Sequence, residues 1–430
     1  MPLAAEGSND IYPKGALVLE MLRDYLGPRP FWASLHLYLE RHALGNATTD
    51  DLRQAIREAT GENLAWFFDE WMYAAGYPDF DVSSSYDAAS RRLTLHVRQT
   101  QPDTARADST GLRFATPAVF RMPVDIRVGT AAGDVTRRFL LDRREQDLVL
   151  DSVATPTMVV FDEGDHILKK LTFPQPTPWL AELLRRDPGL WERQWAIEQL
   201  ATRTNEPPAA RALAQAVTGA DYFRTRAAAA GALAHFGAAA ALPPLRAALR
   251  DTSSAVRAAA VEALGRIGGG QAAALARTAF QRDPSNQVRA AALVTLARTD
   301  TSAAAPVIRQ ALADPVEAIR TAAMNAIEIS GDTAFLPAVE ARLADGSGFP
   351  PAFALAAMAA HGSAHALDVL VAHLNDPNTM VRRAVVTAFQ ELPPALTAAP
   401  LRAALPSLQH DDTRRAVEGI LRRPARVPPG

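Results

Sequence analysis

The chain has 430 residues, 48% of them hydrophobic, which predicts roughly two to four domains with ordinary apolar cores. Its 45 basic and 47 acidic residues give a net charge of −2, which argues against a dedicated binder of nucleic acid or anionic membranes. There is no cysteine, so disulfides, thiolate metal sites and a cysteine nucleophile are excluded, and the mean hydropathy of −0.06 is that of a soluble protein.

Residues 1–79 are rich in aromatic side chains and have helical periodicity. The apolar residues of the first expected helix fall on one face, and Gly27-Pro28 ends it. Thr48 is expected to cap a later helix that Gly61 terminates. A last helix is expected over residues 66–74. The apolar face of the first helix consists of Val18, Met21, Leu22, Tyr25 and Leu26, and a second helix is marked by Phe31, Leu35, Tyr38 and Leu39.

Residues 80–175 change to a period of two, which is typical of strands. Strict alternation is found in three segments, residues 92–98, 123–128 and 136–141, and glycines at 129 and 133 indicate a hairpin turn between the last two. The run over residues 158–161 has the composition of a buried strand. Short strands separated by turn residues predict a β-sandwich.

Residues 178–425 contain a repeat with a period near 31. Each unit begins with an arginine followed, in most units, by an alanine-rich helix, which predicts an α-solenoid that resembles HEAT repeats. Pro351 stands where one unit lacks its arginine. The repeated arginines are Arg193, Arg226, Arg257, Arg289, Arg320, Arg382 and Arg414.

In most units an aspartate precedes the arginine by six residues. In four units proline follows this aspartate, which predicts a helix N-cap with proline in the first turn. The arginines are expected to form a structural ladder between neighbouring units, and an anion-binding groove is the alternative. The aspartates are Asp187, Asp251, Asp283, Asp314 and Asp376.

Two segments resemble the second half of the catalytic domain of the zinc aminopeptidases related to aminopeptidase N, a gluzincin family. The first is Asn-Asp-Ile-Tyr-Pro-Lys-Gly-Ala at residues 9–16, and the second lies in residues 47–78 and includes Trp-Phe-Phe-Asp-Glu-Trp-Met-Tyr-Ala-Ala-Gly-Tyr-Pro. The strand region resembles the small β domain that follows the catalytic domain in this family. The resemblance implies a thermolysin-like catalytic domain, peptide substrates and zinc as the cofactor of the complete protein.

The resemblance gives Tyr12 a catalytic role. In the family the tyrosine of Tyr-x-Lys-Gly stabilises the transition state, because a neutral phenol can donate a hydrogen bond to the tetrahedral oxyanion. The alternative for Tyr12 is an aromatic residue that packs at a helix start. Gly15 is assigned to close helix packing, and the role of Lys14 stays open.

The zinc ligands that the resemblance calls for are missing from the sequence. There is no His-Glu-x-x-His, and the Gly-x-Met-Glu-Asn segment that anchors the substrate in the family is absent too. Among the nine histidines only His361 and His365 have the required spacing, without the glutamate, and solvent-exposed loop histidines are the favoured interpretation. Likewise, Gly265 to Gly270 is interpreted as a turn between helices instead of a phosphate loop.

Two functions follow from these patterns. The favoured one is a zinc-dependent aminopeptidase, or its C-terminal fragment, which would be inactive alone; we then expect the DNA upstream of Met1 to encode the missing motifs. The alternative is a non-catalytic scaffold whose solenoid binds a protein partner. The first ten residues lack the basic and apolar regions of a signal peptide, and the compartment stays open.

Overall fold

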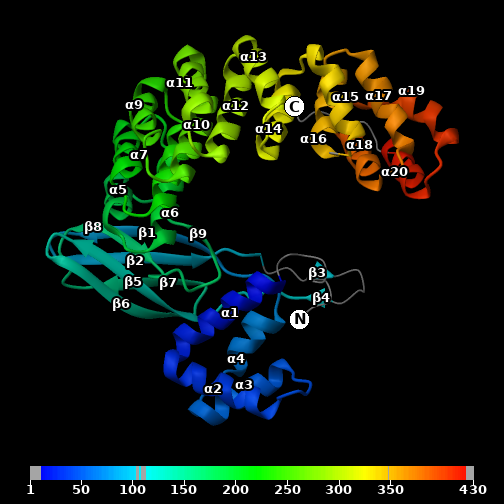
Figure 1. Cartoon of the computed structure of the whole chain (residues 1–430). Coiled ribbons are helices and arrows are strands. Elements are labelled where there is room, and N and C mark those ends of the chain that lie inside the picture. The colour runs from blue at the N-terminus through cyan, green and yellow to red at the C-terminus, as the bar shows by residue number, and fades with distance from the viewer. Residues whose placement is uncertain (1–10, 103–105, 108–112, 347, 423–430) are drawn as a thin grey trace. The chain divides into compact units, whose positions relative to one another are not determined.

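The computed structural model describes residues 11–102, 106–107, 113–346 and 348–422 (Figure 1). The chain divides after Leu200 into two compact units. Within the described ranges, no helix combines the length and the apolar character that spanning a bilayer requires. Asn9 and Asp10, which belong to the first family-like segment, lie outside the described residues.

The first unit begins with helices whose ends agree with the predicted capping residues. Thr48 forms a capping box with Asp51, and Gly61 ends the same helix in the left-handed conformation. The helix expected over residues 66–74 differs from the prediction: a short α-helix continues as a π-helical turn. The elements are α1 (Ile11–Leu26), α2 (Pro28–Arg41), α3 (Thr49–Thr60), α4 (Ala65–Phe68) and the π-helix η2 (Asp69–Tyr73).

Two principal sheets follow. One sheet has the order β7-β2-β1-β9 and the other β6-β5-β8, and β3 pairs with β4 separately. All pairings are antiparallel except β1 with β9. The strands are β1 (Asp79–Asp87), β2 (Arg92–Gln99), β3 (Arg106–Ala107), β4 (Arg113–Phe114), β5 (Met122–Thr130), β6 (Gly133–Leu141), β7 (Glu145–Leu150), β8 (Pro156–Phe161) and β9 (Lys170–Thr172).

One apolar core joins the helices and both sheets of the first unit. Phe80 of β1 and Phe161 of β8 bring the two sheets together with their ring centroids 5.4 Å apart. Trp71 of η2 lies 4.9 Å from Phe120, just before β5, and both side chains are buried. The helices and the strands are therefore held together by large side chains from distant parts of the sequence.

Helices α5 (Thr177–Arg186) and α6 (Leu190–Ala201) pack against this same core, through Trp179 and Trp195. A buried ion network adds to the contact: Arg127 of β5 donates hydrogen bonds to Glu163, to Asp134 and to Asp187, which follows α5. Burial acts to lower the pKa of Arg127, but the three carboxylates outweigh it and raise this pKa above its ordinary range. The guanidinium therefore stays charged inside the unit.

The second unit consists of stacked helices, confirming a helical repeat region (Figure 1, green to red). The helices that carry the repeated arginines stack on one another, and buried alanines recur in their contacts. The helices are α7 (Pro207–Gly219), α8 (Phe223–Leu233), α9 (Ala238–Ala248), α10 (Ser254–Ile267), α11 (Gly269–Arg282), α12 (Asn286–Thr299), α13 (Thr301–Leu312), α14 (Glu317–Ser330), η3 (Thr333–Phe335), α15 (Leu336–Ala344), α16 (Phe349–Ala360), α17 (Ala364–Ala372), η4 (His373–Asn375), α18 (Thr379–Glu391), α19 (Pro394–Ala404), η5 (Leu405–Ser407) and α20 (Asp411–Leu421).

The predicted role of the aspartates as N-caps is wrong. Asp283 lies at the C-cap of α11, and Ser285 is the N-cap of α12. The Asp283 carboxylate instead accepts a hydrogen bond of 2.8 Å from the backbone N–H of Ser285, two residues on. Asp314 does the same with Val316 at 2.9 Å. These aspartates therefore fix the turn between two helices, because an aspartate side chain can mimic the backbone of a turn.

Candidate functional site

Tyr12 lies in the first turn of α1 and is 87% exposed. The other face of the same helix is buried in the first unit through Val18, Met21 and Leu22. The helix is therefore anchored by its apolar face, while the tyrosine at its start is presented to solvent. Its role, catalytic or packing, stays a prediction.

The role of Lys14 was left open by the sequence, and the structure gives this residue a defined contact. Its Nζ donates a hydrogen bond of 3.2 Å to the backbone oxygen of Gly76, and burial lowers the pKa of this half-buried lysine. Gly76 has φ of 81°, and a Cβ there would approach Thr116 Cγ2 to 3.1 Å. Lys14 thus ties the start of α1 to the glycine that follows the aromatic segment, 62 residues later in the chain.

Polar contacts of the aromatic segment fix its last turn against the strands. The Trp71 indole donates to the backbone oxygen of Arg121 at 3.1 Å, and Glu70 accepts from Arg121 N at 2.8 Å and Nε at 2.6 Å. The Arg121 guanidinium also lies 5.0 Å from the centre of the Trp66 ring. Sequence analysis placed Trp66, Glu70 and Trp71 on one helix but missed Arg121, whose partners are some 50 residues away and carry no local signal.

The described residues do not supply a zinc site. Nowhere in the described ranges do three or more histidine, aspartate or glutamate side chains converge in a way that would hold a metal ion. His361 follows the end of α16, and His365 lies on α17 and pairs with Glu340 at 3.1 Å. Gly362 and Ser363 lie in the turn between these two helices, as predicted. Zinc therefore does not fit the side chains present, and we derive no chemical step through it.

The predicted structural ladder is present at Arg226, Arg257 and Arg289. Arg257 donates through Nε and Nη2 to the carboxylate of Asp283 in the next unit, at 2.7 and 3.0 Å, and through Nη1 to the backbone oxygen of Asp251 at 2.9 Å. Arg226 pairs with Asp251, and Arg289 with Asp314, both at 2.7 Å. Because carboxylates already occupy these guanidinium groups, they do not form an anion-binding groove.

The ladder is interrupted before the degenerate unit. Arg320 pairs with Glu317 on its own helix and donates to the backbone oxygen of Asp314 at 2.7 Å.

The segment Gly265 to Gly270 holds no phosphate loop: Gly268, with φ of 73°, lies between α10 and α11. This confirms the interpretation as a turn between helices.

Comparisons with known families find matches in the N-terminal helices and in the helical repeats. Residues 8–71 match the Peptidase family M1 domain, residues 210–293 and 273–350 match HEAT repeats, and residues 367–388 match the HEAT repeat associated with sister chromatid cohesion. The predicted resemblance to the aminopeptidase family and to HEAT repeats is thereby confirmed.

Relatives with the name of aminopeptidase are similar over parts of the chain. The puromycin-sensitive aminopeptidase of Caenorhabditis elegans is 29% identical over 196 residues, which cover 45% of this chain and 20% of that protein. Aminopeptidase N of Escherichia coli is 35% identical over 94 residues, 22% of this chain and 11% of that protein. The chain therefore matches a fifth or less of the length of these relatives.

A solved structure is similar in fold. Legionella pneumophila aminopeptidase A, solved in complex with aspartic acid, has a TM-score of 0.57 at 12% sequence identity, covering 95% of this chain and 56% of that one. At this identity the likeness concerns the fold alone. Taken together, residues 8–71 are similar to part of the Peptidase family M1 domain, and residues 210–350 are similar to HEAT repeats.

Proposed function

We propose that the chain acts in a zinc-dependent aminopeptidase that removes N-terminal residues from peptides. In this proposal residues 1–79 form the C-terminal helical part of a thermolysin-like catalytic domain, residues 80–175 a β-sandwich, and residues 178–425 a HEAT-repeat solenoid. The match of residues 8–71 to the Peptidase family M1 domain supports the peptidase class, as do the relatives that carry the name of aminopeptidase.

The observation that carries the proposal is the exposure of Tyr12 at the start of an otherwise well-anchored helix. Hydrolysis of a peptide bond passes through a tetrahedral oxyanion, and an exposed phenol can donate a hydrogen bond to it. Such a donor is most effective when it is held in place before the reaction. The buried face of α1 and the Lys14–Gly76 hydrogen bond supply this positioning.

Zinc enters the proposal through the family, whose aminopeptidases are generally zinc enzymes. Because the described residues offer no ligand cluster, we expect the 430-residue chain to hold less than one zinc per molecule after dialysis and to cleave no aminoacyl anilide. Metal analysis and a chromogenic peptidase assay of the purified chain test this expectation directly. One tightly held zinc per chain would contradict it.

The catalytic role of Tyr12 is tested by Tyr12→Phe in the natural protein, with whatever sequence accompanies this chain. The substitution keeps the ring and removes only the hydroxyl, so kcat on a peptide substrate should fall by about 10²–10³ with little change in KM. Zinc content and melting temperature should not change. The matched control is Tyr73→Phe, since Tyr73 is also exposed but lies in η2.

Two results would decide against the proposal. A fall in kcat of less than about threefold for Tyr12→Phe would remove this tyrosine from the mechanism, given the effect expected of an oxyanion donor. A natural protein that cleaves no aminoacyl substrate would overturn the enzyme itself and favour the scaffold alternative.

The scaffold alternative rests on a hollow in the solenoid. A cavity of about 690 Å³ is lined by α10, α12 and α14, and its lining includes small side chains such as Ala291 and Ala322 together with Arg266 and Arg298. HEAT repeats are suited to protein interaction because their stacked helices present an extended surface. An inactive natural protein whose binding to a protein partner is lost with Arg298→Glu would support this alternative.

A further inference from the structure

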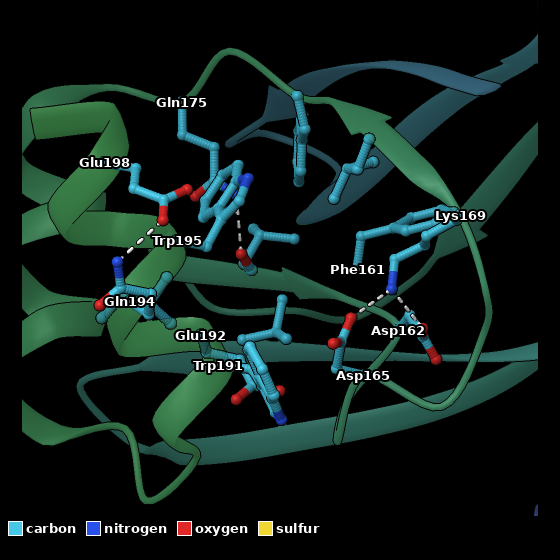
Figure 2. A pocket seen from close by; sticks show the side chains of 15 residues that line it. Phe161, Asp162, Asp165, Lys169, Gln175, Trp191, Glu192, Gln194, Trp195 and Glu198 are labelled. Carbon is cyan, nitrogen blue, oxygen red and sulfur yellow. Dashed lines mark hydrogen bonds and ion pairs between the residues drawn. The ribbon is translucent and has the colours of Figure 1, made fainter. Parts of the chain in front are cut away.

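The first unit contains a cavity that neither the peptidase segment nor the repeats explain. It has a volume of about 270 Å³ and is lined by β8, the loop that follows it, β9 and helices α5 and α6 (Figure 2). All of its lining residues lie in the first unit. The volume is suited to one amino-acid side chain or a small metabolite, since drug-sized ligands occupy cavities of about 300–1,000 Å³.

One wall of the cavity carries a buried ion cluster. Lys169 Nζ donates to Asp162 at 2.5 Å and to Asp165 at 2.6 Å; the Lys169 and Asp162 side chains are only 6% and 3% exposed, whereas Asp165 is 44% exposed (Figure 2). Burial acts to lower the pKa of Lys169, but the two carboxylates outweigh it and raise this pKa. The lysine is therefore charged, and its charge is already neutralised by two carboxylates.

The opposite wall is aromatic. Trp191 and Trp195 lie four residues apart on α6 and so share one face of the helix. Figure 2 shows both indoles on the α6 side of the cavity, across from Lys169. Trp195 packs against the core and holds the wall in place, whereas Trp191 is 69% exposed. An exposed tryptophan beside a fixed one presents π surface to a ligand.

A carboxylate stands beside these indoles. Glu198, one turn beyond Trp195, accepts a hydrogen bond of 2.8 Å from Gln194 through Oε1. Glu198 also lines the cavity and is exposed to solvent, so its carboxylate can accept hydrogen bonds from a ligand.

The lining favours a cation over an anion. Burial raises the pKa of Glu192, so it contributes less negative charge than the other carboxylates. Burial also raises the pKa of Asp162. Even without Glu192 and Asp162, the two carboxylates of Asp165 and Glu198 outnumber the single ammonium of Lys169. An anion entering the cavity would meet this excess of negative charge, whereas an organic cation would be attracted both to the carboxylates and to the faces of the indoles.

We propose that this cavity binds the guanidinium group of an arginine residue from a peptide or protein, stacked on Trp191 and Trp195 and hydrogen-bonded to Glu198. A guanidinium fits better than an ammonium because it is flat and weakly hydrated, stacks on aromatic rings, and donates in parallel to a carboxylate. Asp165, from the opposite wall, adds to the attraction. The proposal does not depend on the peptidase activity.

The test is isothermal titration of the full chain with N-acetyl-arginine amide. The control ligand is N-acetyl-citrulline amide, which has nearly the same shape and no charge. The arginine compound should bind at least about tenfold more tightly, since only it brings a positive charge to the carboxylate and to the indole faces. Equal affinity for the two compounds, or no binding of the arginine compound, would overturn the proposal.

Two variants locate the binding. Glu198→Gln keeps the shape and the acceptor for Gln194 and should weaken arginine binding about tenfold, and Trp191→Leu should weaken it about fivefold through the lost cation–π contact. Matched controls are Glu145→Gln on β7 and Trp32→Leu on α2, both exposed and outside the cavity lining. The controls should bind as the original chain does.

Folding is checked separately, so that a loss of binding can be interpreted. Circular dichroism and the melting temperature of each variant should match those of the original chain, because Trp191 and Glu198 are exposed and lie outside the apolar core. Well-folded variants at both positions that retain full affinity for N-acetyl-arginine amide would show that the cavity is not the binding site.

Discussion

The first unit packs a few large side chains around one centre, whereas the second repeats many small ones between neighbouring helices. Phe67 and Trp71 of the aromatic segment are fully buried in the first unit, together with Phe120 from a distant part of the sequence. In the second unit, buried alanines such as Ala263 and Ala292 let successive helices approach, and each helix contacts its neighbours. Stability in the first unit should depend on single residues, and in the second on the sum of similar interfaces.

The largest expected effect concerns independent folding. Residues 201–430 should fold alone and give a strongly helical circular dichroism spectrum, because nearest-neighbour stacking needs no contact with the first unit. A fragment that begins at residue 178 should also be helical but should expose Trp179 and Trp195, which pack on the first core. Tryptophan fluorescence separates the two fragments, and a disordered spectrum for residues 201–430 would contradict the comparison.

Removing one aromatic ring from the first core should have the next largest effect. Phe67→Ala should destabilise the first unit by about 3–5 kcal/mol, because the lost burial is accompanied by a cavity. Trp32→Ala is the control, since Trp32 is 60% exposed. Calorimetry of the full chain should show only the transition of the first unit shifting to lower temperature. A shift of both transitions would mean that the units unfold together.

Overfilling an interface between repeats should destabilise the protein less than removing a core aromatic ring. Ala292, on α12, is fully buried, and Ala292→Leu should destabilise the second unit by about 1–3 kcal/mol because the neighbouring helices must move apart. Ala274→Leu, at an exposed position of α11, is the control. Denaturant unfolding of residues 201–430 measures both. If the two variants are equally stable, close helix approach is not what the alanines provide.

A smaller loss of stability is expected when a single arginine–aspartate pair of the ladder is weakened. Arg257→Lys keeps the charge but loses the parallel hydrogen bonds to Asp283, and the second unit should lose about 1 kcal/mol. Arg320→Lys is the matched comparison, because Arg320 pairs only within its own helix and its own unit. Its effect on the denaturation midpoint should be smaller. The reverse order would show that the ladder does not contribute through pairing between units.

The smallest expected effect is a dependence of the stability of the second unit on pH. The hydrogen bond from Arg226 lowers the pKa of Asp251, so this carboxylate stabilises the folded state above its unfolded pKa of about 4. That contribution should be lost as the pH falls below about 4. Asp251→Asn should therefore weaken the second unit at pH 7 and reduce its further loss of stability in acid. Urea midpoints between pH 7 and pH 3 test the prediction, and parallel curves for the two proteins would contradict it.

Local patterns in the sequence were sufficient where neighbouring residues decide the structure. The ends of α3 follow from Thr48 and Gly61, and the alternation over residues 92–98 predicted β2, because caps and periodicity act within a few residues. Strands β1 and β7 were missed. β1 contains three aspartates, a residue depleted in strands, and its pairing with β2 and β9 decides its conformation.

In the candidate site, too, some features could be predicted from the sequence and others appear only in the folded unit. Tyr12 was chosen from a sequence motif, and its catalytic role remains a prediction; its exposure and the Lys14–Gly76 hydrogen bond are properties of the folded unit. The zinc ligands were absent from the sequence itself. The cavity of Trp191, Lys169 and Glu198 was not foreseen, since its walls come from separate strands, a loop and a helix.

The repeat in the second half of the chain could be predicted from the sequence, because arginine and alanine recur at a nearly constant spacing. Tertiary structure alone decided how each arginine is paired. The spacing placed Asp251 six residues before Arg257, yet the carboxylate that Arg257 contacts is that of Asp283 in the next unit, and Asp251 offers only its backbone oxygen. The reason is geometric: stacking brings the next turn to the guanidinium, whereas the preceding aspartate directs its carboxylate toward Arg226.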